Sequence, residues 1–360
     1  MKIFYDEKML LHRIPDGLFD SFPSPLLEKQ IEQPEGADRI INTVSVLKRG
    51  PLGYRLSWGN PVSATDDELL KFHTEEYLQS LKQADKTGEY LSASTYLAKG
   101  ALQIVRLAAG TVLSALRNVL SGKDLMSYAI CRPPNHHARP DMADGYCFVN
   151  GIGLAALEAI AQGYKKIAII DWDVHHGNGT QAGFYDRDDV LTISMHMDHG
   201  SWGTSHPETG GVEEIGVDTG AGFNINLPLP FGSGDKCYTS VFEQFVVPKV
   251  QAFKPDLIIL ANGQDANQFD PNGRQMVTMA GYYQMACQLR ELTHEVCRGK
   301  LVMTQEGGYN PTYAPLCAYA VVAGLLEEEM EIEDPIAFYP EDSIRAEGDV
   351  RALQESHPLF

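Results

Sequence analysis

Residues 167–179 read IAIIDWDVHHGNG, and this stretch decides the class of fold. Its first four residues are apolar with no polar alternation, which predicts a strand that is buried on both faces. Such a strand belongs in a parallel sheet that helices cover on each side. The Asp and His residues that follow then lie at the carboxyl end of the strand, the edge where open α/β sheets bind ligands.

Other apolar runs in the chain follow the same plan. Further buried strands are predicted at residues 128–131, 190–195, 257–261 and 301–304. Helices are predicted from helical spacing at residues 94–120, 149–162 and 275–297, the first ending at Ser121 and Gly122. The strands precede the polar clusters RPPNHH, HMDHG, NGQDA and QEGGY, in that order. Because parallel strands end at the same edge, we expect these clusters and DWDVHHGNG to converge on one site.

The overall composition narrows the class of function. The chain of 360 residues has 29 Lys and Arg against 48 Asp and Glu, a formal charge of -19 at pH 7. Nucleic-acid binding relies on clustered positive charge, so this balance argues against it and favours a cationic substrate or partner. The hydrophobic share of 44% is that of a globular protein. Because no repeat, linker or break in composition divides the chain, a single domain over residues 1–360 is predicted.

The chain ends and the cysteines indicate the cellular setting. The opening residues MKIFYDEKML lack the features of a signal peptide, and no stretch reaches the roughly 18 apolar residues that span a bilayer. We therefore expect a cytoplasmic protein without a membrane partner. None of the six cysteines lies in a C-x-x-C pair, which favours reduced thiols over disulfides or a cysteine zinc site. The acidic segment 327–360 is predicted to be a solvated, loosely ordered tail.

Asp173 and His175 stand two residues apart just after the strand predicted at 167–170. The period-two geometry of a strand directs both side chains the same way. An Asp oxygen and a His nitrogen, with a third protein ligand and an open position, form a catalytic Zn²⁺ site, and Asp265 is the natural third ligand. Asp is also common at strand ends as a capping residue. Clustered buried carboxylates and histidines are nevertheless costly unless a metal neutralises them.

Two other clusters carry groups suited to the hydrolysis of an amide. His136 and His137 follow Pro133 and Pro134, and histidine serves as base and acid near neutral pH. Tyr309 follows two glycines, whose turn presents the hydroxyl group to a developing oxyanion. Taken alone, the histidine pair is also typical of a weak metal site or a packing feature, and the glycine turn of a surface tyrosine.

The motifs RPPNHHA, DGYCFVNGIGLAA, DWDVHHGNGTQ, PETG, NINLPLP, NGQDANQFDP and EGGY follow one another in this order. Together they resemble the histone deacetylase and acetylpolyamine amidohydrolase superfamily over about residues 30–325. Trp172 and Asn178 are similar to its class II branch, which includes bacterial amidohydrolases. Arg39 in QPEGADRI resembles the first-loop motif, although Gln33 stands where a His is usual. The resemblance implies the arginase/deacetylase α/β fold, a single, mostly parallel eight-stranded sheet with helices on both faces.

The resemblance also implies a role for each matching residue. Asp173, His175 and Asp265 resemble the ligands of one catalytic Zn²⁺ per chain, with Fe²⁺ as the alternative metal. His136 and His137 resemble the paired catalytic histidines, in which His137 is the general base and one of the two acts as general acid.

Further matching positions are implied around this centre. Asp171 resembles the carboxylate that orients His136, Asn178 would orient His137, and Tyr309 resembles the tyrosine that polarises the acyl carbonyl. A structural K⁺ is implied at Asp171, Asp173, His175, Ser194 and Met195.

The positions that match the substrate channel are unusual. The resemblance places Gly145, Tyr146, His206 and Asn272 there, where relatives that bind acetyl-lysine use two Phe rings and an apolar Leu or Met. Buried polar groups left unpaired cost about 1–3 kcal/mol each. A shorter or more polar amide is therefore expected to be at least as good a substrate as acetyl-lysine. If water or the channel walls satisfy these groups, acetyl-lysine still binds. In the loop after the strand predicted at residues 190–195, His199 is a further candidate metal ligand or a loop hydrogen-bonding residue.

The sequence therefore predicts a zinc-dependent amidohydrolase that removes an acetyl-type group from acetyl-lysine, an acetylpolyamine or a small polar amide. The resemblance implies a homo-oligomer. Two alternatives stay open, a catalytically silent module that binds acylated ligands and a two-metal, arginase-like hydrolase.

Overall fold

The central element of the computed structural model, which describes residues 1–15, 24–29, 33–201, 209–335 and 340–360, is an eight-stranded sheet. The strands are β1 (Lys2–Phe4), β2 (Ser57–Gly59), β5 (Met126–Ala129), β6 (Ile167–Asp171), β7 (Val190–Met197), β8 (Asn224–Leu229), β9 (Leu257–Asn262) and β10 (Leu301–Gln305). Their order is β2-β1-β5-β10-β9-β6-β7-β8, and neighbouring strands are parallel. The predicted fold class is thus confirmed, with one strand, β5, placed two residues earlier than expected.

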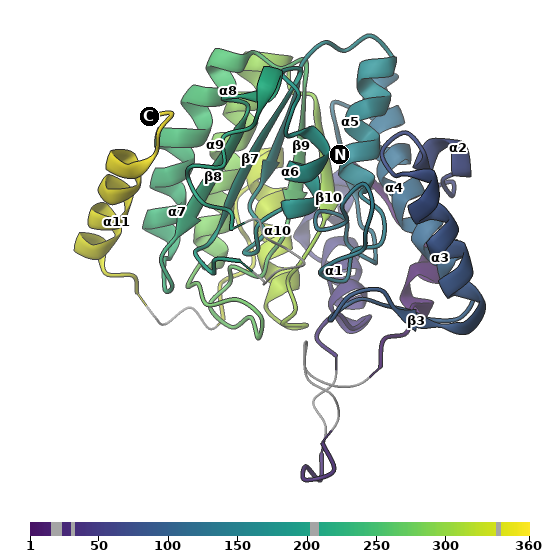
Figure 1. Ribbon diagram of the computed structural model, residues 1–360. Coiled ribbons are helices and arrows are strands. Elements are labelled where there is room, and N and C mark those ends of the chain that lie inside the picture. The colour runs from purple at the N-terminus through teal and green to yellow at the C-terminus, as the bar shows by residue number, and fades with distance from the viewer. Residues whose placement is uncertain (16–23, 30–32, 202–208, 336–339) are drawn as a thin grey trace.

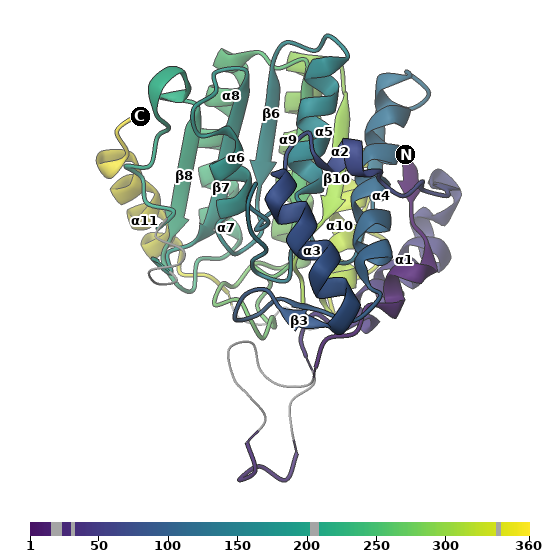
Figure 2. The ribbon, with the colours of Figure 1, turned by 45° about the vertical axis from the view of Figure 1, so that its right-hand side comes forward.

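Helices cover both faces of the sheet (Figures 1 and 2). The helices are α1 (Asp38–Arg49), α2 (Asp66–Leu69), α3 (Glu75–Thr87), α4 (Leu102–Leu120), α5 (Gly151–Ala161), α6 (Asn178–Phe184), α7 (Asp235–Val241), α8 (Val247–Phe253), α9 (Met279–Cys297), α10 (Ala314–Leu326) and α11 (Ser343–Ser356). Ile167 and Ile169 of β6 pack in the core with α3, α4 and α5, whereas Ala168 and Ile170 face the core formed with α1, α7, α9 and α10. Alternate residues of one apolar strand therefore supply two cores, which explains its lack of polar alternation.

The strands that precede the five polar clusters are neighbours in the centre of the sheet. β5, β10, β9, β6 and β7 lie side by side in that order. In the register of β6, Asp171 pairs with Ala261 of β9 on one side and with Ser194 of β7 on the other. Segments far apart in the sequence thus end at one edge of the sheet, as predicted.

The helix predicted at residues 94–120 begins later than expected, at Leu102. Tyr96–Leu97 instead forms the short strand β4, which pairs antiparallel with β3 (Glu89–Tyr90). Gly100 has a φ of 76°, which interrupts any helix before Leu102, whose amide donates to the Asp85 carboxylate at 2.7 Å. The predicted end is confirmed, since the helix stops at Ser121 before a left-handed Gly122.

The prediction of a loosely ordered tail is wrong for the C-terminal part of segment 327–360. Residues Ser343–Ser356 form α11, which packs against α7 and buries Ala346, Val350 and Leu353. These apolar residues recur at helical spacing within the acidic sequence, so burial of this stripe outweighs the solvation of its charged neighbours. The Glu341 carboxylate adds a second attachment by accepting the backbone amide of Gly234 at 2.7 Å.

Among the described residues, no helix is long and apolar enough to cross a membrane. The six cysteines are free thiols, and all but Cys287 are buried.

Candidate metal centre and catalytic site

Asp173, His175 and Asp265 meet at the carboxyl ends of β6 and β9. Their ligand atoms lie within 4.8 Å of one another, and all three side chains are buried. His175 Nδ1 lies 3.3 Å from Asp173 Oδ1 and 3.2 Å from Asp265 Oδ2. The structure therefore brings together the three residues that the sequence predicts as zinc ligands.

The electrostatics of this trio fit a cation. Burial and the negative charge of Asp173 raise the pKa of Asp265 to about 8. Burial alone would lower the pKa of His175, but hydrogen bonds to Asp173 and Asp265 raise it to about 10. Two carboxylates held this close and out of water repel each other unless positive charge lies between them. Two oxygen donors and one nitrogen donor form a set that Zn²⁺ accepts in catalytic sites.

Two glycines leave room for the carboxylates. A Cβ on Gly307 would lie 2.0 Å from Asp265 Oδ2, and one on Gly263 would lie 2.3 Å from Asp173 Oδ2. The Gly307 amide also donates to Asp173 Oδ2 at 2.7 Å. Asp173, His175 and Asp265 are together called the metal group. The first glycine of EGGY, Gly307, is thus required next to this group, in addition to any role in turning the chain.

The two adjacent histidines each pair with a different partner through Nδ1. His136 Nδ1 lies 2.9 Å from Asp171 Oδ2, and His137 Nδ1 lies 2.8 Å from Asn178 Oδ1. Both rings are buried, and their centroids are 3.9 Å apart. In each pair the partner occupies Nδ1 and leaves Nε2 for other contacts, an arrangement suited to proton transfer.

The pKa values of the two histidines are shifted in opposite directions. Burial alone would lower the pKa of His136, but the carboxylates of Asp173 and Asp171 raise it well above its ordinary value. Burial, together with the positive charges of His136 and His175, lowers the pKa of His137 well below its ordinary value. The site therefore favours a protonated His136 beside a neutral His137.

Glu306 ties the histidine loop to the tyrosine loop. Its carboxylate accepts the backbone amides of Asn135 at 2.7 Å and of His136 at 3.1 Å, and the hydroxyl of Thr304 at 2.6 Å. Its oxygens also lie near His136 and Cys147 in a second group of potential metal ligands. Because hydrogen bonds from the protein already occupy both oxygens, we assign Glu306 a structural role.

Tyr309 is buried beside the metal group. The guanidinium carbon of Arg39 lies 5.2 Å from the centroid of its ring, and Arg39 also donates to the Glu306 carbonyl at 2.8 Å. The backbone amide of Tyr309 donates to Asp270 Oδ2 at 2.7 Å. Burial and the charges of Asp173 and Asp265 raise the pKa of Tyr309 well above its ordinary value, which keeps the hydroxyl protonated as a hydrogen-bond donor.

Two of the four predicted channel residues, Gly145 and Tyr146, lie next to predicted catalytic side chains. A Cβ on Gly145 would lie 2.2 Å from the His137 ring, so only glycine lets the loop pass this closely. The Tyr146 ring meets the Tyr309 ring edge-on at 5.7 Å. The partly buried Asn272 donates its backbone amide to Asp270 Oδ1 at 2.9 Å. The fourth, His206, lies outside the described residues.

His199 lies near the centre without joining the metal group. Its ring centroid is 6.3 Å from that of His175, and its Nδ1 lies 2.7 Å from the Gly200 carbonyl. This contact agrees with the loop hydrogen-bonding alternative.

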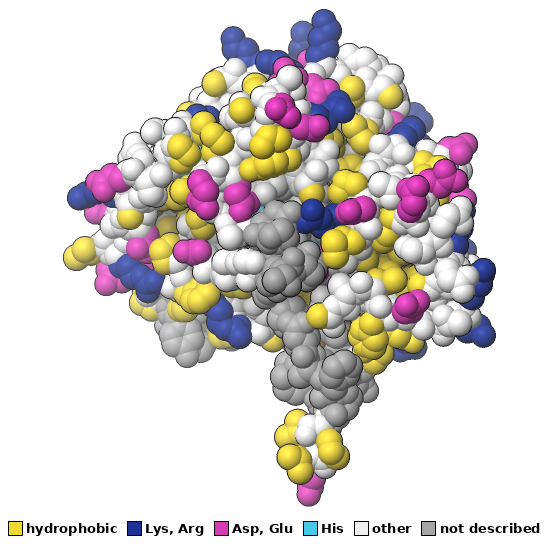
Figure 3. Space-filling model, viewed as in Figure 1, with side chains coloured by type: hydrophobic (Ala, Val, Ile, Leu, Met, Phe, Trp, Pro, Cys, Tyr) yellow, Lys and Arg dark blue, Asp and Glu magenta, His cyan; other side chains and the backbone are white. Residues whose placement is uncertain are grey.

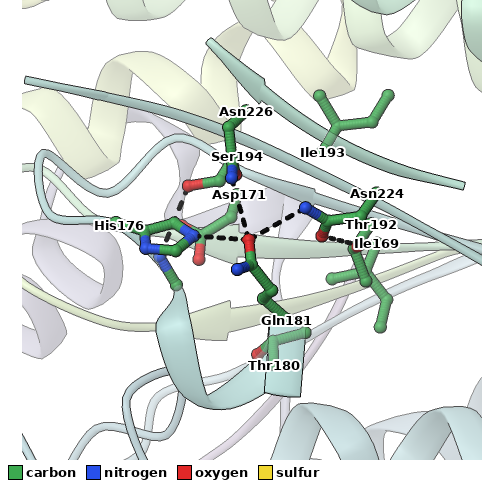
Figure 4. Close-up of a pocket in the computed structure, with 11 residues that line it drawn as sticks. Ile169, Asp171, His176, Thr180, Gln181, Thr192, Ile193, Ser194, Asn224 and Asn226 are labelled. Carbon is green, nitrogen blue, oxygen red and sulfur yellow. Dashed lines mark hydrogen bonds between the residues drawn. The ribbon is translucent and has the colours of Figure 1, made fainter. Parts of the chain in front are cut away.

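A small polar pocket lies behind Asp171, between β6, β7, β8 and α6 (Figure 4). At its centre, Gln181 Oε1 accepts three hydrogen bonds. The donors are His176 Nε2 at 2.9 Å and the side-chain amides of Asn224 and Asn226 at 2.8 Å each. Asp171 and Ser194, two of the residues implied for K⁺, line this pocket. Two more, Asp173 and His175, follow directly in the chain, and Met195 is buried in β7. Of the five residues implied for K⁺, the structure thus places Asp171 and Ser194 side by side in register on β6 and β7.

This constellation can be compared with known proteins. The histone deacetylase domain matches residues 33–325. The chain belongs to the histone deacetylase family. Histone deacetylase 8 of Arabidopsis thaliana is 45% identical over 363 residues, which cover 99% of this chain and 96% of that protein. A histone deacetylase-like amidohydrolase of Pseudomonas aeruginosa is 37% identical, covering 92% of this chain and 88% of its own.

A solved structure agrees with this placement. The crystal structure of the HDA15 HD domain superposes with a TM-score of 0.81 at 33% identity and covers 98% of this chain and 96% of that one. This histone deacetylase family member is accordingly a hydrolytic deacetylase of the amidohydrolase type.

Sequence reasoning missed three carboxylates that organise the site of this deacetylase. Glu306 holds the histidine loop, Asp270 holds the tyrosine and channel loops, and Asp144 accepts a hydrogen bond from Asn178 at 3.0 Å. Each lies within a few residues of a predicted site residue, and that proximity is the signal that was available. Their targets are backbone or amide groups, which spacing in the sequence does not reveal.

Proposed function

We propose that this deacetylase is a metal-dependent amidohydrolase that removes an acetyl-type group from an amine, with one Zn²⁺ per chain as the preferred metal. The observation that carries the proposal is the buried trio Asp173, His175 and Asp265, with both histidine pairs and Tyr309 around it. A bound divalent metal supplies a Lewis acid that polarises the acyl carbonyl and makes water more acidic.

The surrounding residues perform the proton transfers. His137, neutral and holding its Nδ1 against Asn178, accepts a proton from the attacking water through Nε2. The Tyr309 hydroxyl donates a hydrogen bond to the carbonyl oxygen as negative charge develops there. One of the two histidines then protonates the departing amine.

The implied K⁺ has a structural part in this proposal. Asp171 and Ser194 would supply side-chain oxygens to it, with backbone groups of Asp173, His175 and Met195. Positive charge at this position would offset the buried carboxylate of Asp171, which also faces His136 at 2.9 Å. A K⁺ bound there would hold Asp171, and through it His136, in place.

The channel favours polar substrates. Tyr146 stands against Tyr309, and Asn272 is attached to the same carboxylate that holds the Tyr309 backbone. A short or polar amide gives these groups hydrogen-bonding partners that the hydrocarbon stem of acetyl-lysine does not. The net charge of -19 adds long-range attraction for cationic amines. On the face shown in Figure 3, acidic and basic side chains are interspersed, so this attraction arises from the total charge.

A substrate panel on zinc-loaded protein tests this function. We expect chelator-sensitive amine release, with kcat/KM for acetylpolyamines and short polar amides at least equal to that for acetyl-lysine peptides. Tyr309→Phe should lower kcat by about 10²–10³-fold, because one oxyanion donor is lost. Full turnover by that variant would remove Tyr309 from the mechanism, and a clear preference for the peptide would contradict the polar-channel argument.

Metal analysis of the same preparation separates the one-metal proposal from the arginase-like alternative. We expect full activity at one metal per chain. Two equivalents at full activity would favour the two-metal site.

A further inference from the structure

We propose that Asp144 is a positioning residue that sets the orientation of the Asn178 amide and, through it, the tautomer of His137. The inference rests on the proposed role of His137 as general base and names what prepares this base for its task. It assigns a function to a carboxylate outside the metal group and outside both histidine pairs.

The contacts form a continuous chain. Asp144 Oδ2 accepts from Asn178 Nδ2 at 3.0 Å, and Asn178 Oδ1 faces His137 Nδ1 at 2.8 Å. The other carboxylate oxygen, Oδ1, accepts the Gly145 amide at 2.8 Å. Asn178 is buried at the start of α6. The oxygen of its side-chain amide faces His137, and the nitrogen faces Asp144. Asp144 itself is partly exposed and reaches inward to this contact.

The chemistry of these groups fixes each orientation in turn. An ionised carboxylate only accepts hydrogen bonds, so the NH₂ end of the Asn178 amide must face Asp144. The oxygen end must then face His137, and an amide oxygen accepts only from a protonated Nδ1. With its single proton on Nδ1, neutral His137 presents a lone pair at Nε2, which a general base requires.

An asparagine by itself does not determine this tautomer. Rotated by half a turn, its amide would offer NH₂ to His137 and favour the tautomer with the proton on Nε2. In that form His137 has no lone pair at Nε2 with which to accept a proton from water. The Asp171 carboxylate has no such ambiguity with His136, because both of its oxygens accept. Asp144 thus ensures that an acceptor oxygen faces His137 Nδ1, as either oxygen of Asp171 does for His136.

The first test replaces Asp144 by its closest amide. In Asp144→Asn, the Oδ1 atom still accepts the Gly145 amide, so the turn of the channel loop is kept. The new NH₂ group faces the NH₂ of Asn178, which drives the Asn178 amide to rotate. We expect kcat to fall about 10- to 100-fold, as is typical when an outer orienting partner is removed, with little change in KM. The matched control is Asp141→Asn in the same loop. The Asp141 side chain is 68% exposed and lies 3.9 Å from Arg139 Nε, and its replacement should leave kcat unchanged.

The second test exchanges the two side chains. Asn178→Asp alone places two carboxylates opposite each other and should also lower kcat. The double variant Asp144→Asn with Asn178→Asp restores a donor facing an acceptor, with an oxygen again toward His137 Nδ1. We expect it to recover most of the lost kcat at high pH, where His137 stays neutral even with a carboxylate at its Nδ1. If the fold-decreases in kcat of the two single variants multiply in the double variant, Asp144 acts only on the turn at Gly145. That result would overturn the inference.

A spectroscopic measurement reports the tautomer without any need for turnover. With ¹⁵N-labelled histidine, the imidazole nitrogens of His137 should show the Nδ1-protonated form in the wild type and in the exchanged variant. Asp144→Asn should show a mixture or the reverse form. An unchanged tautomer in Asp144→Asn would refute the positioning role, even if the protein is an active deacetylase. If the wild-type protein hydrolyses no amide of the panel, that result refutes the proposed function and leaves the tautomer measurement standing.

Discussion

The two histidine pairs have nearly the same geometry and opposite electrostatics. His136 faces Asp171 at 2.9 Å and His137 faces Asn178 at 2.8 Å, from adjacent positions of one loop. The pKa of His136 is raised by nearby carboxylates despite its burial, whereas burial and neighbouring positive charge lower that of His137. The charges around each ring therefore divide the labour between two similar rings: Asp173 and Asp171 favour the charged form of His136, and the neighbouring histidines favour the neutral form of His137.

The charge of each partner also decides how it must be supported. Asp171 lies at the end of β6 and faces His136 at 2.9 Å, so its negative charge lies against a ring whose pKa is raised. Asn178 has no charge to balance, but its amide has two different ends. Its support is therefore Asp144, which selects one of them.

Removing each ring in turn gives the largest expected difference. His137→Ala should lower kcat by about 10⁴-fold, because the general base is lost, and His136→Ala by about 10²-fold. Steady-state amine release on the best substrate of the panel measures both, and thermal unfolding checks that both variants fold. Equal losses would show that the charges around the two rings do not separate the two roles.

Replacing Asp171 or Asn178, the Nδ1 partners of the two histidines, should give a smaller difference. It is measured best as a change in the free energy of unfolding. Asp171→Asn should lower the free energy of unfolding by about 3 kcal/mol, because it leaves the charge of buried His136 without its counter-ion. Asn178→Ala should lower it by about 1–2 kcal/mol, the range for a neutral group that loses its partner. Urea unfolding of the metal-loaded proteins measures both values. A larger loss for Asn178→Ala would contradict the assignment of charge to the His136 pair.

The smallest effects are expected from crowding each pair with one methyl group. A Cβ on Gly145 would lie 2.2 Å from the His137 ring, and one on Gly177 would lie 2.4 Å from Asp171 Oδ2. We expect each alanine variant to lower kcat about tenfold, because small displacements of positioned groups are costly.

Gly100→Ala is the matched control for Gly145→Ala, whose φ of 50° is also left-handed, because Gly100 combines a φ of 76° with open space around the new Cβ. It should change stability alone. A similar loss of kcat in Gly100→Ala would show that backbone strain, and not displacement of the pairs, is responsible.

Much of this site could be predicted from the sequence because its residues follow buried strands. Asp173 and His175 lie just beyond an apolar run, and Asp265 lies just beyond another. Parallel strands that are buried on both faces must end at one edge, so these residues had to approach each other. The errors arose where packing outweighed local pattern, as at residues 94–101 and in the C-terminal helix α11, whose few apolar residues bury against α7.

The sequence by itself determined the class of fold and predicted the three candidate metal ligands and the histidine pair that meet at one sheet edge, because strand periodicity and motif order constrain them strongly. Only the tertiary structure decided how these residues are held in place. Glu306 and Asp144 reach backbone and amide groups across 170 and 34 positions of the chain, respectively. Such contacts depend on how loops fold back over the sheet edge, and a linear pattern carries no record of that path.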